Sequence, residues 1–137
     1  MTRARLWLDR MAAYAAMLDD MGVGLDDIDR GWAGCHCVSR QYTGRRSAAA
    51  WLRRTAGTLS EGAGEHALAA ARLYARAYDR WREYERLLSR ASYRKPLPDL
   101  GAAWSDPARR HAAAAAVRRA AALEDEAAKL VRRALDA

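Results

Sequence analysis

The side chains with the clearest capacity for chemistry lie in one short segment, Cys35-His36-Cys37. Thiolates and imidazoles are ligands for zinc and copper, so these three residues are candidate metal ligands. If the segment is helical, however, residues two apart point about 200° away from each other, and both sulfurs cannot reach one ion. The spacing therefore favours no metal and no cofactor, with Cys35 packed as a small apolar residue.

A cysteine nucleophile is a second possibility, because a nearby base or cation favours the reactive thiolate. On a helix His36 points away from its neighbouring thiols. The base that would activate Cys35 or Cys37 must then be His66 or His111, brought close by the fold. These two cysteines and two histidines are the candidate catalytic residues of a small helical enzyme.

Aromatic and imidazole side chains provide the candidate binding residues, Trp32, His36, Tyr74 and Tyr78. In the enzyme hypothesis the same four residues, together with Cys35, would line the pocket. Glu61, Glu65 and His66 lack the Glu-x-x-His spacing of di-iron bundles, so they are interpreted as a capping cluster at the start of a helix. The residues of the chain alone do not decide between an enzyme and a binding protein.

The elements that would position these residues are helices, because apolar residues recur at helical spacing. One seam runs through Trp7, Met11, Tyr14, Leu18 and Met21; a second runs through Ala70, Tyr74, Ala77, Trp81, Tyr84, Leu88 and Ala91; a third runs through Ala116, Ala120, Leu123, Ala127, Leu130 and Ala134. We expect an all-α bundle of four or five helices in which the aromatic seam packs on the alanine-rich one.

Helix boundaries follow from capping residues and from proline. Pro96 and Pro98 interrupt the helical pattern, and Asp106-Pro107 is typical of a helix start. The expected elements are helices at 2–21, 25–42, 47–56, 60–90 and 107–135, with a Pro-containing loop at 92–105.

Three local expectations concern individual positions. Ala48, Trp51 and Leu52 should face the interior of the short helix at 47–56. Gly62 and Gly64 should loosen the first turn of the helix that follows. The run Glu124-Asp125-Glu126 should form a solvated acidic face, with Asp125 paired to Lys129 one turn later.

Length, composition and charge set wider limits. A chain of 137 residues is sufficient for one domain over 1–137 with its own core. No apolar run approaches the about 18 residues that a membrane span needs, and two cysteines do not form a secreted disulfide framework. We therefore expect a cytoplasmic protein that does not engage membranes.

The net charge of +7 makes nucleic-acid binding an alternative. Paired arginines recur at Arg45-Arg46, Arg53-Arg54, Arg109-Arg110, Arg118-Arg119 and Arg132-Arg133. Acidic residues are interleaved, however, and most aromatic residues belong to the core seams, whereas nucleic-acid grooves need both kinds on one surface. The charge pattern thus favours solubility and scattered ion pairs.

One set of features spans about two-thirds of the chain: the run Arg46-Ser47-Ala48-Ala49-Ala50-Trp51-Leu52, Tyr74 with Trp81, Arg110, and Glu124-x-x-Ala127. Together these features resemble the helical C-terminal region of the butirosin biosynthesis protein H-like family. In that family the catalytic cysteine and histidine belong to a separate α/β domain, so no catalytic residue carries over. The resemblance implies a stand-alone helical accessory module, beside a natural-product pathway, that binds a partner protein or a small acyl-type ligand. We also expect it to form homo-oligomers.

Overall fold

The computed structural model describes residues 3–20, 44–89 and 102–137, and every regular element within these ranges is helical. Its elements are α1 (Arg3–Asp20), α3 (Glu61–Tyr84), a π-helix η1 (Glu85–Ser89) that continues α3, and α6 (Pro107–Asp136), with further helical segments at 44–56 and 102–105. The predicted all-α bundle is thus confirmed. The expected helix at 25–42 and the two prolines of the expected loop lie outside the described residues.

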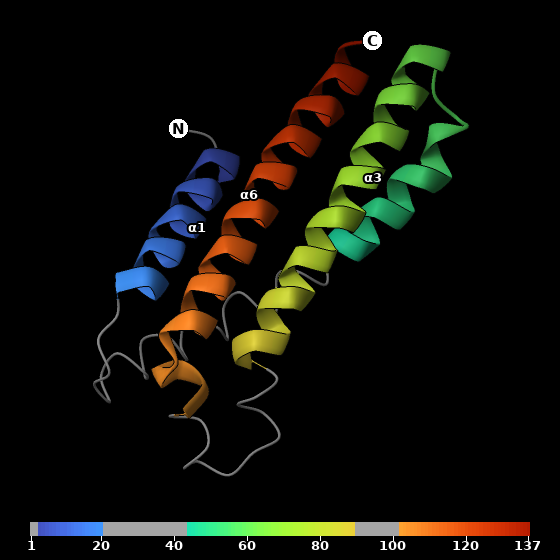
Figure 1. The fold of residues 1–137 in the computed structure, drawn as a ribbon. Coiled ribbons are helices and arrows are strands. Elements are labelled where there is room, and N and C mark those ends of the chain that lie inside the picture. Colours follow the sequence, from blue (N-terminus) through green and yellow to red (C-terminus); the bar gives the residue numbers. More distant parts are fainter. Residues whose placement is uncertain (1–2, 21–43, 90–101) are drawn as a thin grey trace.

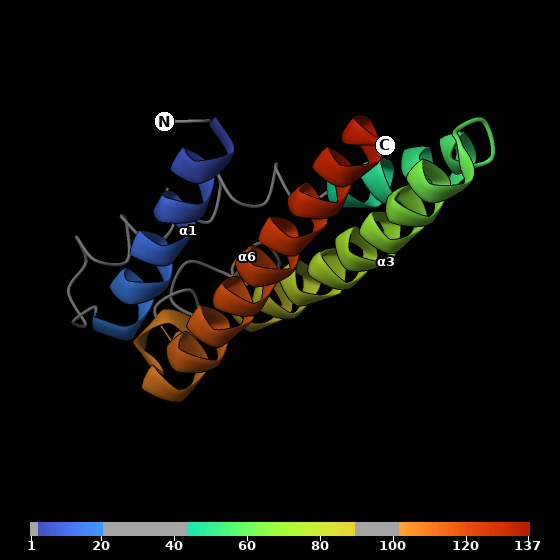
Figure 2. The same ribbon diagram turned by 90° about the horizontal axis from the view of Figure 1, so that it is seen from above.

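The long helix α6 is the central element of the bundle (Figures 1 and 2). It runs antiparallel to α3 on one side and to α1 on the other, and its interface with α3 is the larger of the two. The 44–56 helix, teal in Figure 1, lies against the first half of α3. Residues 57–60 join the 44–56 helix to α3. Because α3 and α6 are antiparallel, the N-terminal end of α3 lies near the C-terminal end of α6.

Local sequence signals explain where α6 begins and where the 44–56 helix ends. The Asp106 carboxylate accepts hydrogen bonds from the backbone nitrogens of Ala108 (2.9 Å) and Arg109 (3.4 Å), and Pro107 occupies the first helical position, as predicted. After the 44–56 helix, the amide of Thr58 donates to the carbonyl of Thr55 at 2.9 Å. That turn reverses the chain and leads directly into α3.

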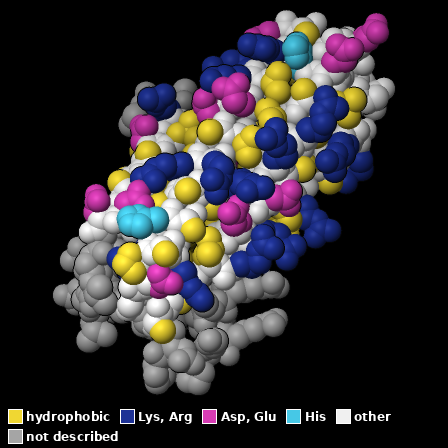
Figure 3. Space-filling view, viewed as in Figure 1, with side chains coloured by type: hydrophobic (Ala, Val, Ile, Leu, Met, Phe, Trp, Pro, Cys, Tyr) yellow, Lys and Arg dark blue, Asp and Glu magenta, His cyan; other side chains and the backbone are white. Residues whose placement is uncertain are grey.

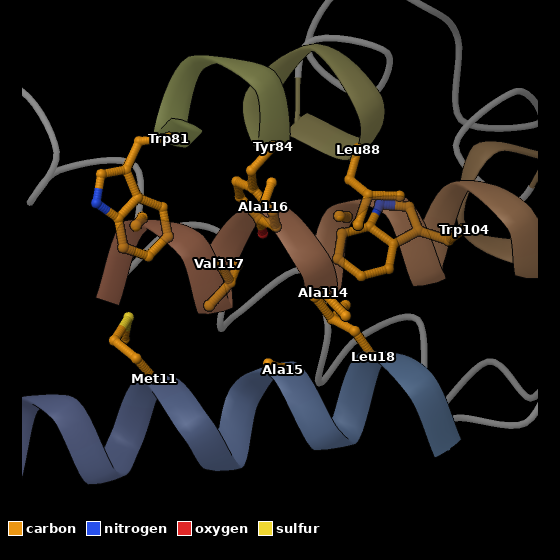
Figure 4. Close-up of a cluster of buried hydrophobic side chains, with 12 residues drawn as sticks. Met11, Ala15, Leu18, Trp81, Tyr84, Leu88, Trp104, Ala114, Ala116 and Val117 are labelled. Carbon is orange, nitrogen blue, oxygen red and sulfur yellow. The ribbon is translucent and has the colours of Figure 1, made fainter. Parts of the chain in front are cut away.

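The main core forms where aromatic side chains meet small ones (Figure 4). On one side of α6 lie Trp81, Tyr84 and Leu88, and on the other side lie Met11, Ala15 and Leu18 of α1. Trp104 lies at one end of the cluster, and Ala114, Ala116 and Val117 of α6 lie between the two groups. All of these residues are buried. The predicted packing of aromatic residues against an alanine-lined helix is therefore confirmed.

A second, smaller core joins the 44–56 helix to α3. Its buried members are Leu52, Ala56, Ala67, Ala70 and Ala71, against which Tyr74, Leu130 and Val131 pack. A β-carbon added to Gly64 would lie 2.7 Å from the carbonyl oxygen of Ala56. Gly64 is helical and buried, so the prediction that it loosens the first turn of α3 is wrong. It allows two helices to approach closely.

Two further local predictions are wrong. Trp51 is 57% exposed rather than inward, because Ala49, Leu52 and Ala56 recur at helical spacing and define a buried face that excludes it. The end of the expected loop at 92–105 is also helical, at 102–105, and Trp104 within it is buried. Burial of this indole against Leu88 favours an ordered turn where we expected a loop.

Candidate functional site

Glu124 lies in the interior of the bundle, with only 6% of its surface exposed. The prediction that it belongs to a solvated acidic face is wrong, although Asp125 does pair with Lys129 at 2.8 Å as expected. Adjacent residues on a helix point about 100° apart, so three consecutive acids do not share one environment. Glu124 follows the buried Ala120 by four positions and precedes the buried Ala127 by three.

The carboxylate of Glu124 accepts four hydrogen bonds from three side chains. Its Oε1 accepts from Nε of Arg45 at 2.8 Å and from the indole nitrogen of Trp81 at 2.7 Å. Its Oε2 accepts from Nη2 of Arg45 at 2.6 Å and from the indole nitrogen of Trp7 at 2.9 Å. The arrangement with Arg45 is a bidentate charge-assisted pair, and all of the usual acceptor positions of the carboxylate are used.

These contacts join four separate elements at one point. Trp7 comes from the second turn of α1, Arg45 from the start of the 44–56 helix, Trp81 from α3 and Glu124 from α6. The guanidinium carbon of Arg45 also lies 5.1 Å from the centre of the Trp7 ring, within range of a cation–π contact. In a buried ion pair of this kind, desolvation of the two charges offsets much of the attraction between them.

A cleft of about 620 Å³ opens beside this network. Its apolar lining consists of Trp7, Leu8, Ala48, Tyr74 and Ala128, with Gly44 beside them, and its charged lining consists of Arg5, Arg45, Lys129, Arg132, Glu124 and Asp125. Four basic side chains against two acidic ones give the described lining a net positive charge. The arrangement can hold an apolar molecule of modest size and attract negative charge to it.

Tyr74 is the sequence-predicted binding residue that the structure places in this cleft. Burial raises the pKa of its phenol above the ordinary value of 10.0; the nearby Glu124 carboxylate adds to the rise, and Arg45 opposes it. The hydroxyl is therefore protonated at neutral pH and able to donate a hydrogen bond. Tyr78 has a different environment on α3, where the guanidinium carbon of Arg82 lies 5.9 Å from the centre of its ring.

The two candidate catalytic histidines are far apart. His66 is half-buried near the start of α3, and His111 is exposed near the start of α6; because these helices are antiparallel, the residues lie at opposite ends of the bundle (Figure 1). Nδ1 of His111 lies 2.7 Å from Oδ1 of Asp19, which connects α6 to α1. Nη2 of Arg118 donates to the other oxygen of Asp19 at 2.5 Å. These two partners lower the pKa of Asp19 below its ordinary value of 3.8, the hydrogen bond from His111 most of all.

The remaining candidates, Trp32, Cys35, His36 and Cys37, lie outside the described residues. Within 3–20, 44–89 and 102–137, no group of three or more histidine, cysteine, aspartate or glutamate side chains is placed to hold a metal ion. Of the predicted site residues, the structure therefore places Tyr74 in the cleft. It adds three residues that the sequence did not predict for the site: Trp7 was assigned to the core seam, Arg45 to a basic pair and Glu124 to a solvated face.

Several of the paired arginines make contacts within the protein. Arg45 binds Glu124, Nη1 of the buried Arg110 donates to the carbonyl oxygen of Trp104 at 2.6 Å, and Arg118 binds Asp19. On the face drawn in Figure 3, basic side chains are spread along the molecule with acidic ones among them. On this face, the distribution agrees with scattered ion pairs.

Comparison with known proteins finds no relative of this chain. No family model matches the chain, and neither the curated proteins nor the solved structures include a match to it. Among the helices of the described ranges, none is long and apolar enough to cross a membrane.

Proposed function

We propose that this protein is a helical binding module, without catalytic activity of its own, whose cleft beside Glu124 holds a small acyl- or aryl-type ligand. The observation that carries the proposal is the cleft itself, which combines apolar walls from four helical segments with the polar side chains around Glu124. Its volume lies within the range typical of small-molecule sites, about 300 to 1,000 Å³.

The state of Glu124 supports binding rather than catalysis. A general base needs a free lone pair directed at the substrate, and a metal ligand needs one directed at the ion. Both oxygens of Glu124 already accept two hydrogen bonds each, from Arg45 and from the indoles of Trp7 and Trp81. The carboxylate holds the walls of the cleft in place and has no lone pair left for reaction.

The context of a natural-product pathway, and of a cytoplasmic location, stays a prediction from the sequence. Its support is the resemblance through Arg46–Leu52, Tyr74, Trp81, Arg110 and Glu124-x-x-Ala127 to the butirosin biosynthesis protein H-like family. Two of those residues, Trp81 and Glu124, are hydrogen-bonded to each other, and Glu124 lines the cleft. Self-association is likewise a prediction, and sedimentation velocity of the purified chain measures it.

Fluorescence of the neutral apolar probe phenylnaphthylamine tests the proposed function. We expect the probe to bind with one-to-one stoichiometry and a blue-shifted emission. Ala128→Phe, which would fill the cleft from α6, should abolish binding, whereas Ala122→Phe on the exposed side of the same helix should not. Failure of the probe to bind the unmodified protein, or equal loss in both variants, would contradict a ligand-binding cleft.

A further inference from the structure

The four basic side chains that line the cleft differ in their ion-pair partners. Arg45 is bound to Glu124, while Arg5 and Lys129 each pair with an acidic residue one turn away in their own helix, at 3.4 and 2.8 Å. Arg132 is exposed and forms no ion pair with any residue of the described ranges. Among the described residues that line the cleft, it is therefore the basic group that a ligand can engage without breaking an ion pair within these ranges.

The spacing along α6 fixes where Arg132 lies relative to the base of the cleft. Glu124, Ala128 and Arg132 are four residues apart, so they lie on one face of the helix. At a rise of 1.5 Å per residue, Arg132 lies about 12 Å along the axis from Glu124. The small side chain of Ala128 lies between them and leaves room above the helix, with Leu8, Ala48 and the ring of Trp7 as neighbouring walls.

From this placement we propose that the ligand is an anionic amphiphile: an apolar acyl chain or aromatic body lying over Ala128, with a carboxylate or phosphate head group bound by the guanidinium of Arg132. Guanidinium binds both oxyanions in a planar, two-point geometry. The net positive charge of the described lining favours the same sign of ligand. This inference rests on the proposed function and adds the class of ligand to it.

A matched pair of probes tests the inference. Anilinonaphthalene sulfonate carries an anionic group on the ring system of phenylnaphthylamine, so the comparison isolates the charge. We expect the anionic probe to bind more tightly than the neutral probe. Added salt should weaken binding of the anionic probe and leave binding of the neutral probe unchanged. Arg132→Gln should lower the affinity for the anionic probe about tenfold or more, which is the loss expected for one charge-assisted hydrogen bond. The same change should leave the affinity for the neutral probe unchanged. Arg133→Gln, a neighbouring exposed residue that does not line the cleft, should change neither.

Competition with aliphatic compounds then distinguishes the source of the head group. Decanoate and decyl phosphate should each displace the anionic probe better than decanol, and the tighter of the two identifies the preferred head group. Equal displacement by decanol, or equal losses in Arg132→Gln and Arg133→Gln, would overturn the anionic class while leaving a cleft that binds the neutral probe. If the neutral probe does not bind the unmodified protein, the proposed function fails and this inference with it.

Discussion

Arg45 and Glu124 are 79 positions apart in the chain, yet they meet through two parallel hydrogen bonds of 2.8 and 2.6 Å. The side chain of Glu124 is 6% exposed and that of Arg45 17%, so the pair is largely screened from water. Because Trp7 and Trp81 donate to the same carboxylate, the pair determines how α1, the 44–56 helix, α3 and α6 are placed around the cleft.

Replacing Glu124 by glutamine should destabilise the protein by about 3 to 5 kcal/mol, because the guanidinium of Arg45 then lacks its counter-charge in a buried site. Chemical denaturation followed by circular dichroism measures the change in the free energy of unfolding. Asp125→Asn is the matched control, since this neighbour makes an exposed pair with Lys129 and should cost about 0.5 kcal/mol or less. Similar losses in the two variants would contradict the buried role of Glu124.

Trp81→Ala should cost roughly 3 to 5 kcal/mol, since it removes a large ring that is 1% exposed and leaves a cavity against α6. Trp81→Phe keeps a smaller ring in the core and removes the hydrogen bond to Glu124, so its loss of stability should be smaller than that of Trp81→Ala. Arg86→Ala, an exposed change nearby in the chain, should cost about 0.5 kcal/mol or less. Equal effects of Trp81→Ala and Arg86→Ala would mean that the buried face of α3 is wrongly assigned.

Replacing a glycine by alanine should have opposite effects on stability at two positions in the first turn of α3. Gly62 has open space around an added β-carbon, so Gly62→Ala should be neutral or stabilise by up to about 1 kcal/mol. Gly64→Ala should destabilise by about 1 to 3 kcal/mol, because its methyl group would collide with the backbone of Ala56 and force the 44–56 helix away. Thermal unfolding of the two variants side by side measures the contrast. A stabilised Gly64→Ala would show that the two helices do not approach as closely as described.

Acid unfolding should depend on Asp19. Its pKa is lower in the folded protein than the ordinary 3.8, so its contribution to stability is present above that value and is lost as the pH falls through the folded pKa. Asp19→Asn should therefore reduce the slope of unfolding free energy against pH below about pH 4. Asp9→Asn, whose carboxylate makes an exposed pair within α1 at 3.4 Å, is the control. An unchanged slope in Asp19→Asn would contradict the contacts with His111 and Arg118.

The buried face of the helix that carries Trp81 was predictable because it depends on periodicity. Trp81, Tyr84 and Leu88 recur at spacings of three and four, and the structure buries all of them. The position of Glu124 was not predicted, because a charged side chain is normally assigned to solvent. The missed signal was its register with Ala120 and Ala127, which places it on the buried face of α6.

The partner of Glu124 could not be found from local patterns. Arg45 belongs to one of five arginine pairs, and nothing in its neighbourhood distinguishes it from the other pairs. Its role depends on where the 44–56 helix lies, and that placement depends on the approach at Gly64 and on the small core around Leu52. Contacts between residues far apart in sequence depend on the tertiary arrangement, which local sequence patterns do not reveal.

The alanine-rich face of α6 has a consequence for how this protein tolerates change. Ala113, Ala114, Ala116 and Ala120 are fully covered, so each larger residue introduced there would act as a wedge and widen the gap between α6 and its neighbours. Leu8, Ala48 and Ala128 border open volume instead, where side-chain size can vary without displacing a helix. New ligand preferences should therefore be obtained by mutating these three positions, while the alanine face accepts few replacements.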